Sequence, residues 1–345
     1  MNIDDFNRFK EKTKVISRIK ECFHHKKEDC KGRIKQAHSI QRNGRLSIIE
    51  NEVNKNLCLY CFTNFVSNED LVMADLVPIG KKEASTFFGF CDYHDTTLFS
   101  PIENFRFDID SDEHLFLHSY RSFAHSYHKK KEELNYWQNH HQNHIGNKLS
   151  YFTRVSMIYG NKTALNELEK SKMFLDKAIE NKKYDSLEYF VYEKEGLFPF
   201  AVSSQMSPKV TYNGISMNNH DDPNIPYENP IITFLPDKES TFVIIAAFPH
   251  ESKSVKLINE LSNLNDLNVE HAITSLIIAN CENTFFSPLF WNSLSKIFQK
   301  RLLSEFSDNT ASDKYRTKFF KSSFNFFDDK FEINNLKKNA GSITN

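Results

Sequence analysis

Residues 90–95 read Phe-Cys-Asp-Tyr-His-Asp, and the fold expected for the N-terminal part follows from them. Cys91 and His94 are two residues apart at the expected start of a helix, and Cys22 and Cys30 lie upstream with seven residues between them. Two sulfurs from a loop, with one sulfur and one imidazole from a first helical turn, can close the tetrahedral site that zinc prefers. The sequence therefore predicts a structural Zn²⁺ site at these four positions. The alternative is a set of isolated buried thiols with a surface histidine.

Two further residues accompany the predicted zinc ligands. His38 follows Cys30 by eight residues, at the end of the strand-like run 33–40, and Asp95 comes directly after His94. This order resembles the treble-clef (ββα-metal) form of the HNH nuclease family, in which a knuckle pair and a strand-end histidine precede a second ligand pair at a helix start. The resemblance covers about residues 20–103. It implies that His38 is a general base, which activates water, and that Asp95 holds a catalytic Mg²⁺ or Mn²⁺ at the scissile phosphate.

The sequence also departs from the motif of that family. Ala37 stands where these nucleases often have a metal-binding aspartate or histidine, and an insertion of residues 44–85 separates the two halves. The asparagine expected between the strands is not evident, and Asp95 stands where histidine or asparagine is usual. His38 therefore has two alternative interpretations. It is a structural histidine with satisfied hydrogen bonds, or it is a zinc ligand that replaces one of the four predicted ligands.

Charge is unevenly distributed along a chain whose formal net charge is −1. Residues 1–50 contain 13 basic and 7 acidic residues, a net charge of +6. Such a segment is typical of a module that contacts a polyanion, and equally of a solvated, lysine-rich helix. A nucleic-acid partner, DNA or RNA, is the expectation that agrees with the resemblance.

The distribution of apolar residues predicts a chain that does not enter a membrane. Its longest apolar runs, such as Phe242–Phe248, fall far short of the roughly 18–20 residues that a spanning helix needs. The first residues are polar and lack a secretory signal pattern. We therefore expect a cytoplasmic protein, in which the six cysteines are metal ligands or buried thiols instead of disulfides.

The pattern along the chain predicts an α+β protein in four parts. These are the HNH-like zinc module with its insertion (1–105), a helical region (106–195), an α+β domain with an antiparallel sheet (196–306) and a polar tail (307–345). Helices are expected at 3–21, 46–53, 111–144, 162–195, 252–264, 268–280 and 287–306. Strands are expected at 197–203, 208–212, 230–235 and 241–248, with a hairpin turn at 236–240.

Three other patterns receive structural interpretations. Cys58 and Cys61 have knuckle spacing but lie in an apolar, strand-like run, which favours buried thiols. The acidic run 108–112 lacks the glycine and the glutamate of a calcium loop, so it more simply suits a helix start. Four histidines at 114, 118, 125 and 128 form one stripe of the long helix, and we expect this stripe to be a solvated face.

The sequence thus predicts a metal-dependent endonuclease or a nucleic-acid-binding protein. An HNH-like module on such a chain resembles prokaryotic anti-phage or mobile-element proteins, which implies a role in antiviral defence. The alternative is a non-catalytic, zinc-stabilised scaffold that binds a partner protein through its C-terminal domain.

Overall fold

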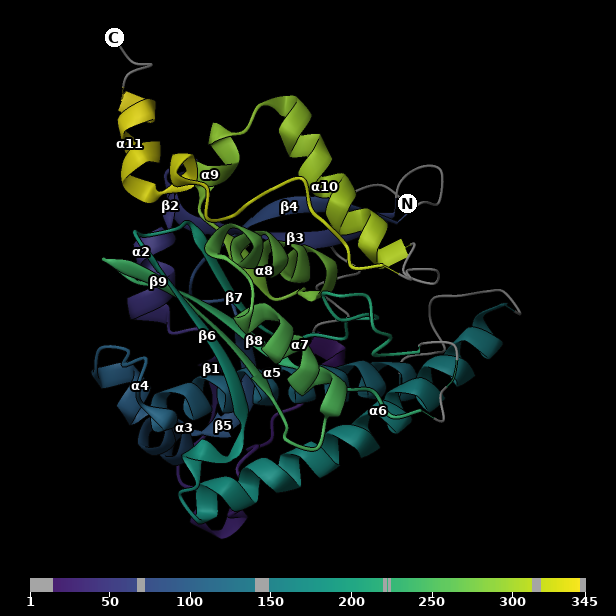
Figure 1. Cartoon of the computed structure of the whole chain (residues 1–345). Coiled ribbons are helices and arrows are strands. Elements are labelled where there is room, and N and C mark those ends of the chain that lie inside the picture. The colour runs from purple at the N-terminus through teal and green to yellow at the C-terminus, as the bar shows by residue number, and fades with distance from the viewer. Residues whose placement is uncertain are drawn as a thin grey trace.

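Antiparallel sheets and long helices organise the chain, as Figure 1 shows, and this confirms the predicted α+β class. The structure is a computed structural model, and it describes residues 15–66, 72–139, 149–219, 222, 225–311 and 318–341. The strands are β1 (Ile34–His38), β2 (Asn51–Val53), β3 (Asn56–Val66), β4 (Val72–Ile79), β5 (Thr86–Cys91), β6 (Glu188–Glu195), β7 (Phe200–Gln205), β8 (Ile231–Pro236), β9 (Ser240–Ala247) and β10 (Thr284–Phe286). The main helices are α3 (Asp92–Leu98), α4 (Ser100–Asn104), α5 (Asp112–Asn139), α6 (Leu149–Glu180), α7 (Ser252–Ser262), α8 (Asp266–Asn280), α9 (Pro288–Ser293), α10 (Lys296–Ala311) and α11 (Ile333–Gly341).

The larger of the two sheets in the described residues has eight strands. Seven of them run in the order β2-β3-β10-β7-β8-β9-β6, and β4 pairs with β3. All these pairs are antiparallel. The β8–β9 hairpin has the predicted turn, in which the Asp237 amide donates to the Ser240 carbonyl at 2.9 Å. The smaller sheet consists of β1 and β5 alone.

Helices cover both faces of the large sheet. Because successive side chains of a strand point to opposite faces, Ile232 and Phe234 of β8 pack into the core with α8, whereas Ile231 packs into the core with α5. In Figure 1 the helix α8 lies on one side of the strands, and α5 and α6 lie on the other. The N-terminal strand β5 packs against α5, since Phe90 and Phe123 share one core, and Ala37 of β1 belongs to the same core.

The histidine stripe of α5 is buried, so the expectation of a solvated face was wrong. His114, His118, His125 and His128 are each at most 9% exposed. Phe87 of β5 packs its ring against the imidazoles of His125 and His128, at centroid distances of 5.3 and 5.6 Å. Helical periodicity shows which residues share a face, but it does not show that a second layer covers that face.

Other elements also differ from the expectations. The helix predicted to reach residue 195 ends at Glu180, and 188–195 form strand β6. Residues 208–212 contribute only an isolated bridge, and the predicted helix 287–306 is divided into α9 and α10. The stretch 46–53, predicted as a helix, begins at the last residue of the π-helical turn η2 (Arg42–Leu46) and continues as the short α2 (Ser47–Ile49) and β2. The expected helix 3–21 lies mostly outside the described residues.

The large sheet crosses the boundaries that the sequence suggested. Its strands come from 51–79 as well as from 188–286, so the insertion 44–85 supplies β2, β3 and β4 to the same sheet as the C-terminal strands. The C-terminal segment also joins this core, because Phe324, Phe326 and Phe327 are at most 5% exposed.

Among the described residues, none of the helices combines the length and the apolar character that crossing a membrane requires.

Candidate metal centre

Backbone hydrogen bonds place the first cysteine pair beside the end of β5. The Glu21 amide donates to the Phe88 carbonyl at 3.2 Å, and the Phe23 amide donates to the Gly89 carbonyl at 2.6 Å. A short 3₁₀ turn, η1 (Lys27–Asp29), then reverses the chain, and the Cys30 amide closes it on the Lys27 carbonyl. Cys22 and Cys30 are thereby brought to the same side of the strand.

The second pair stands at the junction of β5 and α3. Strand β1 runs antiparallel to β5, with Ile34 opposite Cys91. The Asp92 amide donates to the Arg33 carbonyl at 3.0 Å, which fixes the start of α3 against the segment after Cys30. The segment after Cys30 passes very close to the start of α3. A Cβ at Gly32, where φ is +77°, would lie 2.6 Å from Asp92 Oδ2. Only glycine suits this position.

Cys91 is also the N-cap of α3. Its Sγ accepts a hydrogen bond from the His94 amide at 3.4 Å, and its backbone is extended. The two-residue spacing is what brings the His94 side chain back over the cap, because residues three apart on a first helical turn share a face. The local fold therefore directs one sulfur and one imidazole to the same point.

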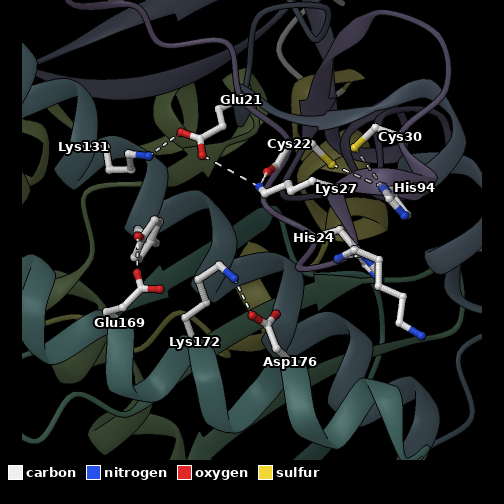
Figure 2. Close-up of polar contacts among 12 residues, drawn as sticks. Glu21, Cys22, His24, Lys27, Cys30, His94, Lys131, Glu169, Lys172 and Asp176 are labelled. Atoms are coloured by element: carbon white, nitrogen blue, oxygen red, sulfur yellow. Dashed lines mark hydrogen bonds and ion pairs between the residues drawn. The ribbon is translucent and has the colours of Figure 1, made fainter.

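The four predicted zinc ligands come together in one group, which we call the Cys/His cluster: Cys22, Cys30, Cys91 and His94. The three sulfurs lie 3.4, 3.6 and 3.3 Å from His94 Nδ1, in that order, and all four candidate ligand atoms lie within 4.8 Å of one another. A tetrahedral site with Zn–S of about 2.3 Å and Zn–N of about 2.05 Å requires S···N separations of about 3.6 Å. Figure 2 shows Cys22, Cys30 and His94 converging in this way.

The cluster is shielded from solvent. Cys22, Cys91 and His94 are at most 4% exposed, and only Cys30 is partly exposed. Burial raises the pKa of Cys22, and it raises the pKa of Cys30 to about 12. At Cys91 burial also acts to raise the pKa, but hydrogen bonds from the amides of His94 and Lys31 outweigh it and leave the pKa lowered. Four such donors with no remaining open position suit a structural metal ion such as zinc.

Sequence reasoning missed one contact of this centre. The ring of His24 stacks on that of His94, with centroids 3.9 Å apart and planes inclined by 14°, and His24 is itself 8% exposed. Burial lowers the pKa of His24 to about 3, so this ring is neutral at pH 7. It covers one face of the His94 imidazole, a potential metal ligand. Its position two residues after Cys22 was the only signal in the sequence.

His38 occupies the end of β1, as predicted. Its Nε2 lies 3.2 Å from the Lys81 carbonyl, and since a carbonyl only accepts, Nε2 carries the proton and Nδ1 is left as the basic nitrogen. Burial is the main cause that lowers the pKa of His38 to about 4. The ring is therefore neutral at pH 7, and His38 is not part of the Cys/His cluster.

Asp95 lies one residue beyond His94, on α3. Its side chain is 16% exposed, Oδ2 is 4.0 Å from Lys35 Nζ, and Oδ1 is buried with no hydrogen-bond partner in the described residues. Burial raises the pKa of this carboxyl group.

An ion pair between the buried Arg121 and the exposed Glu103 links the surroundings of His38 and Asp95. Arg121 of α5 donates to Glu103 Oε1 at 2.6 Å, is 2% exposed, and stacks over the Phe99 ring at 4.0 Å. The charges of both members act on the pKa of His38 and on that of Asp95. Both side chains are thus near this ion pair, which nothing in the sequence indicated.

The remaining patterns stay structural. Cys58 is buried in β3 and Cys61 is partly buried, and neither belongs to a group of potential metal ligands within the described ranges. In the acidic run, Asp108 Oδ1 accepts from the Asp110 amide at 3.0 Å and shapes the turn before α5.

Comparisons of the chain with models of protein families, with curated proteins and with solved structures found no match.

Proposed function

We propose that this chain is a metal-dependent nucleic-acid endonuclease, in which a structural Zn²⁺ at the Cys/His cluster holds a treble-clef-like catalytic unit. The order of parts supports this proposal: a loop pair of ligands, a strand that ends at His38, an antiparallel partner strand, and a helix that begins with the second ligand pair. This is the order on which the resemblance to HNH nucleases rests.

The observation that carries the catalytic part is the state of His38. The Lys81 carbonyl holds the ring in the tautomer whose Nδ1 is unprotonated, and burial keeps it neutral at pH 7. A general base needs a free nitrogen in a fixed position. In the proposed step, water attacks phosphorus and the P–O bond to the leaving oxygen breaks. The proton of the water passes to Nδ1 of His38.

Asp95 is the residue proposed to hold the catalytic Mg²⁺ or Mn²⁺. Its buried Oδ1, which has no hydrogen-bond partner within the part of the chain that the structure describes, is a hard oxygen donor, which both ions favour. Such an ion supplies positive charge next to the phosphate oxygens when it is bound.

A basic and aromatic surface lies beside this unit. The side chains of Arg18 and Lys20 lie over the Phe88 ring at 5.0 and 5.1 Å, and Lys31 lies over Tyr93 at 5.1 Å. All three cations are exposed. Cations and aromatic rings together suit the backbone and the bases of a nucleic acid.

The test is cleavage of plasmid DNA and of RNA with added Mg²⁺ or Mn²⁺. We expect the wild-type chain to cut one of the two polymers, and His38→Ala and Asp95→Ala to be inactive while folded and loaded with zinc. His271→Ala is the matched control, because His271 is an exposed histidine of α8 outside the unit. An inert wild-type chain, or full activity in His38→Ala, would rule out the nuclease.

A specific observation favours a second candidate, a zinc-stabilised scaffold without catalysis. His38 is half-buried, Asp95 is 16% exposed, and Cys22 and Cys91 belong to the same apolar core as α5. These features suit a zinc ion that fastens the N-terminal segment to the rest of the fold. Bound zinc without cleavage of either polymer would support this candidate.

A further inference from the structure

A pocket of about 790 Å³ opens in the C-terminal half, between α8, α10 and α11. Its volume falls within the range of about 300–1,000 Å³ that is usual for small-molecule sites. None of its lining residues belongs to the proposed catalytic unit or to the Cys/His cluster. Nothing in the proposed function uses this pocket.

Phenylalanine rings form much of the pocket wall. They come from Phe298 of α10 and from the segment before α11, which contributes Phe324, Phe327 and Phe331. Phe298 is 49% exposed, and its ring meets that of Phe324 at 6.1 Å, so it stands at the mouth of the pocket. The faces of such rings carry partial negative charge and attract cations.

A buried carboxylate forms the polar end of the pocket. Glu270 is 4% exposed, and its Oε1 accepts from Tyr192 Oη at 2.9 Å and from Lys194 Nζ at 2.8 Å. Its Oε2 accepts from Asn325 Nδ2 at 3.0 Å. The charges of Glu270 and Lys194 therefore neutralise each other, and this carboxylate holds Lys194 in place.

The remaining charge of the pocket is negative. Lys330 pairs with Asp328 at 2.7 Å. Within the described residues the exposed Asp329 carboxylate makes no side-chain hydrogen bond or close ion pair, and only the longer-range charge of Lys194 acts on it. With histidine counted as neutral, the lining residues comprise two lysines and three carboxylates, a formal charge of −1. A carboxylate that has no close ion pair within the described residues and lies beside aromatic faces is suited to a positive group and unfavourable for an anion.

We infer that this pocket binds a small organic cation, an ammonium group on an apolar or aromatic body. Lys330 Nζ already lies over the Phe331 ring, 4.8 Å from its centroid. The ligand ammonium group therefore lies against Asp329 and the other ring faces, and the apolar body fills the space between the phenylalanines. This site is independent of the nuclease proposal, because it shares no residue with it.

The test is isothermal titration calorimetry of the full chain at pH 7 with three matched probes: 4-phenylbutylamine, 4-phenylbutanol and 4-phenylbutyrate. They share a phenyl group on a four-carbon chain and differ in the terminal group, which is cationic, neutral or anionic. We expect the amine to bind at one site and about tenfold more tightly than the carboxylate, with the alcohol in between. Asp329→Asn should weaken binding of the amine about three- to tenfold and leave binding of the alcohol unchanged.

Two further variants complete the design. Phe298→Ala removes an exposed ring without opening the core, and it should weaken the binding of all three probes. Asp185→Asn changes an exposed aspartate outside the pocket and should weaken none. The inference is overturned if the carboxylate binds as tightly as the amine. It is also overturned if amine binding is unchanged in both Asp329→Asn and Phe298→Ala, or if the amine shows no saturable binding up to about 10 mM.

Discussion

At the residue scale, Cys91 has two functions in the metal centre. Its sulfur is one of the four potential ligand atoms, and the same sulfur caps the first turn of α3 by accepting from the His94 amide. Replacement of this sulfur therefore removes a ligand and loosens the helix turn that carries the next ligand.

We predict that Cys91→Ser loses stoichiometric zinc and lowers the thermal unfolding midpoint by about 10 °C or more, since binding of a structural zinc ion contributes directly to folding. Metal analysis of the purified variant and a thermal melt measure both effects. Cys58→Ser is the control, because Cys58 is equally buried but lies outside the cluster. Retention of a full equivalent of zinc by Cys91→Ser would contradict the assignment.

His38 yields a prediction on pH. Its neutral form is the proposed base, and this form predominates above the folded pKa, which burial lowers to about 4. The single-turnover cleavage rate should therefore show no loss attributable to His38 between pH 8 and pH 5. An inflection near pH 6.5 in the wild-type rate would show an exposed imidazole instead. Circular dichroism at each pH checks that the protein stays folded.

The sequence predicted these individual residues better than it predicted their surroundings. The spacing alone was enough to identify Cys91 and His94 as candidate ligands. On the first turn of a helix, two residues separated by a two-residue gap lie on the same face. The Lys81 carbonyl, which orients His38, is 43 residues away in the sequence. The Arg121 guanidinium, whose charge acts on the pKa of His38, comes from helix α5. Contacts of this kind depend on the tertiary fold and leave no local pattern.

At the element scale, α5 is the helix on which the layers meet. Burial lowers the pKa of His118 and of His125 well below the ordinary value of 6.5. For His118 the charges of Arg45, Arg121 and His114 act in the same direction. For His125 those of Lys129 and His128 do so, while Glu132 opposes them. Both rings are neutral in the folded chain.

We predict that stability falls as the pH decreases below about 6.5, where unfolded histidines take up protons that the folded chain excludes. The stabilising effect is fully present above the unfolded pKa, and it is lost as the pH falls toward the folded pKa. Each such histidine contributes up to about 1.4 kcal/mol per pH unit in that interval.

Urea unfolding at pH 7.5 and at pH 5.0 measures this dependence. His118→Gln should show a smaller loss between the two pH values than the wild-type chain, whereas His271→Ala, at an exposed position, should match the wild type. An equal loss in His118→Gln would show that this histidine is not excluded from protonation. The sequence predicted the helix correctly, because its periodicity is local, and failed on the burial of this face, because the covering strands come from elsewhere in the chain.

At the scale of the whole molecule, one apolar core joins the N-terminal and C-terminal parts. It contains Phe23 and Phe90 beside the Cys/His cluster, Phe123 of α5, and Ile231 and Phe248 from the C-terminal half. The sequence predicted an α+β protein with an antiparallel sheet. It gave no indication that residues 51–79 enter that sheet, because strand partners far apart in sequence are set by packing and not by local pattern.

This shared core predicts the response to metal removal. A strong zinc chelator should shift a single unfolding transition of the whole chain to lower temperature, because the centre and the large sheet are packed together. Differential scanning calorimetry with and without the chelator measures the shift. A separate low-temperature transition that alone responds to the chelator would show that the N-terminal part unfolds independently.

We propose that the Cys/His cluster is a structural zinc site with three sulfur ligands and one nitrogen ligand. Zinc K-edge X-ray absorption of the purified, full-length chain tests it most directly, together with the zinc content. We predict one zinc per chain, with three Zn–S bonds of about 2.3 Å and one Zn–N bond of about 2.0–2.1 Å. A chain that folds without zinc, or a zinc ion bound mainly by oxygen and nitrogen, would contradict the claim.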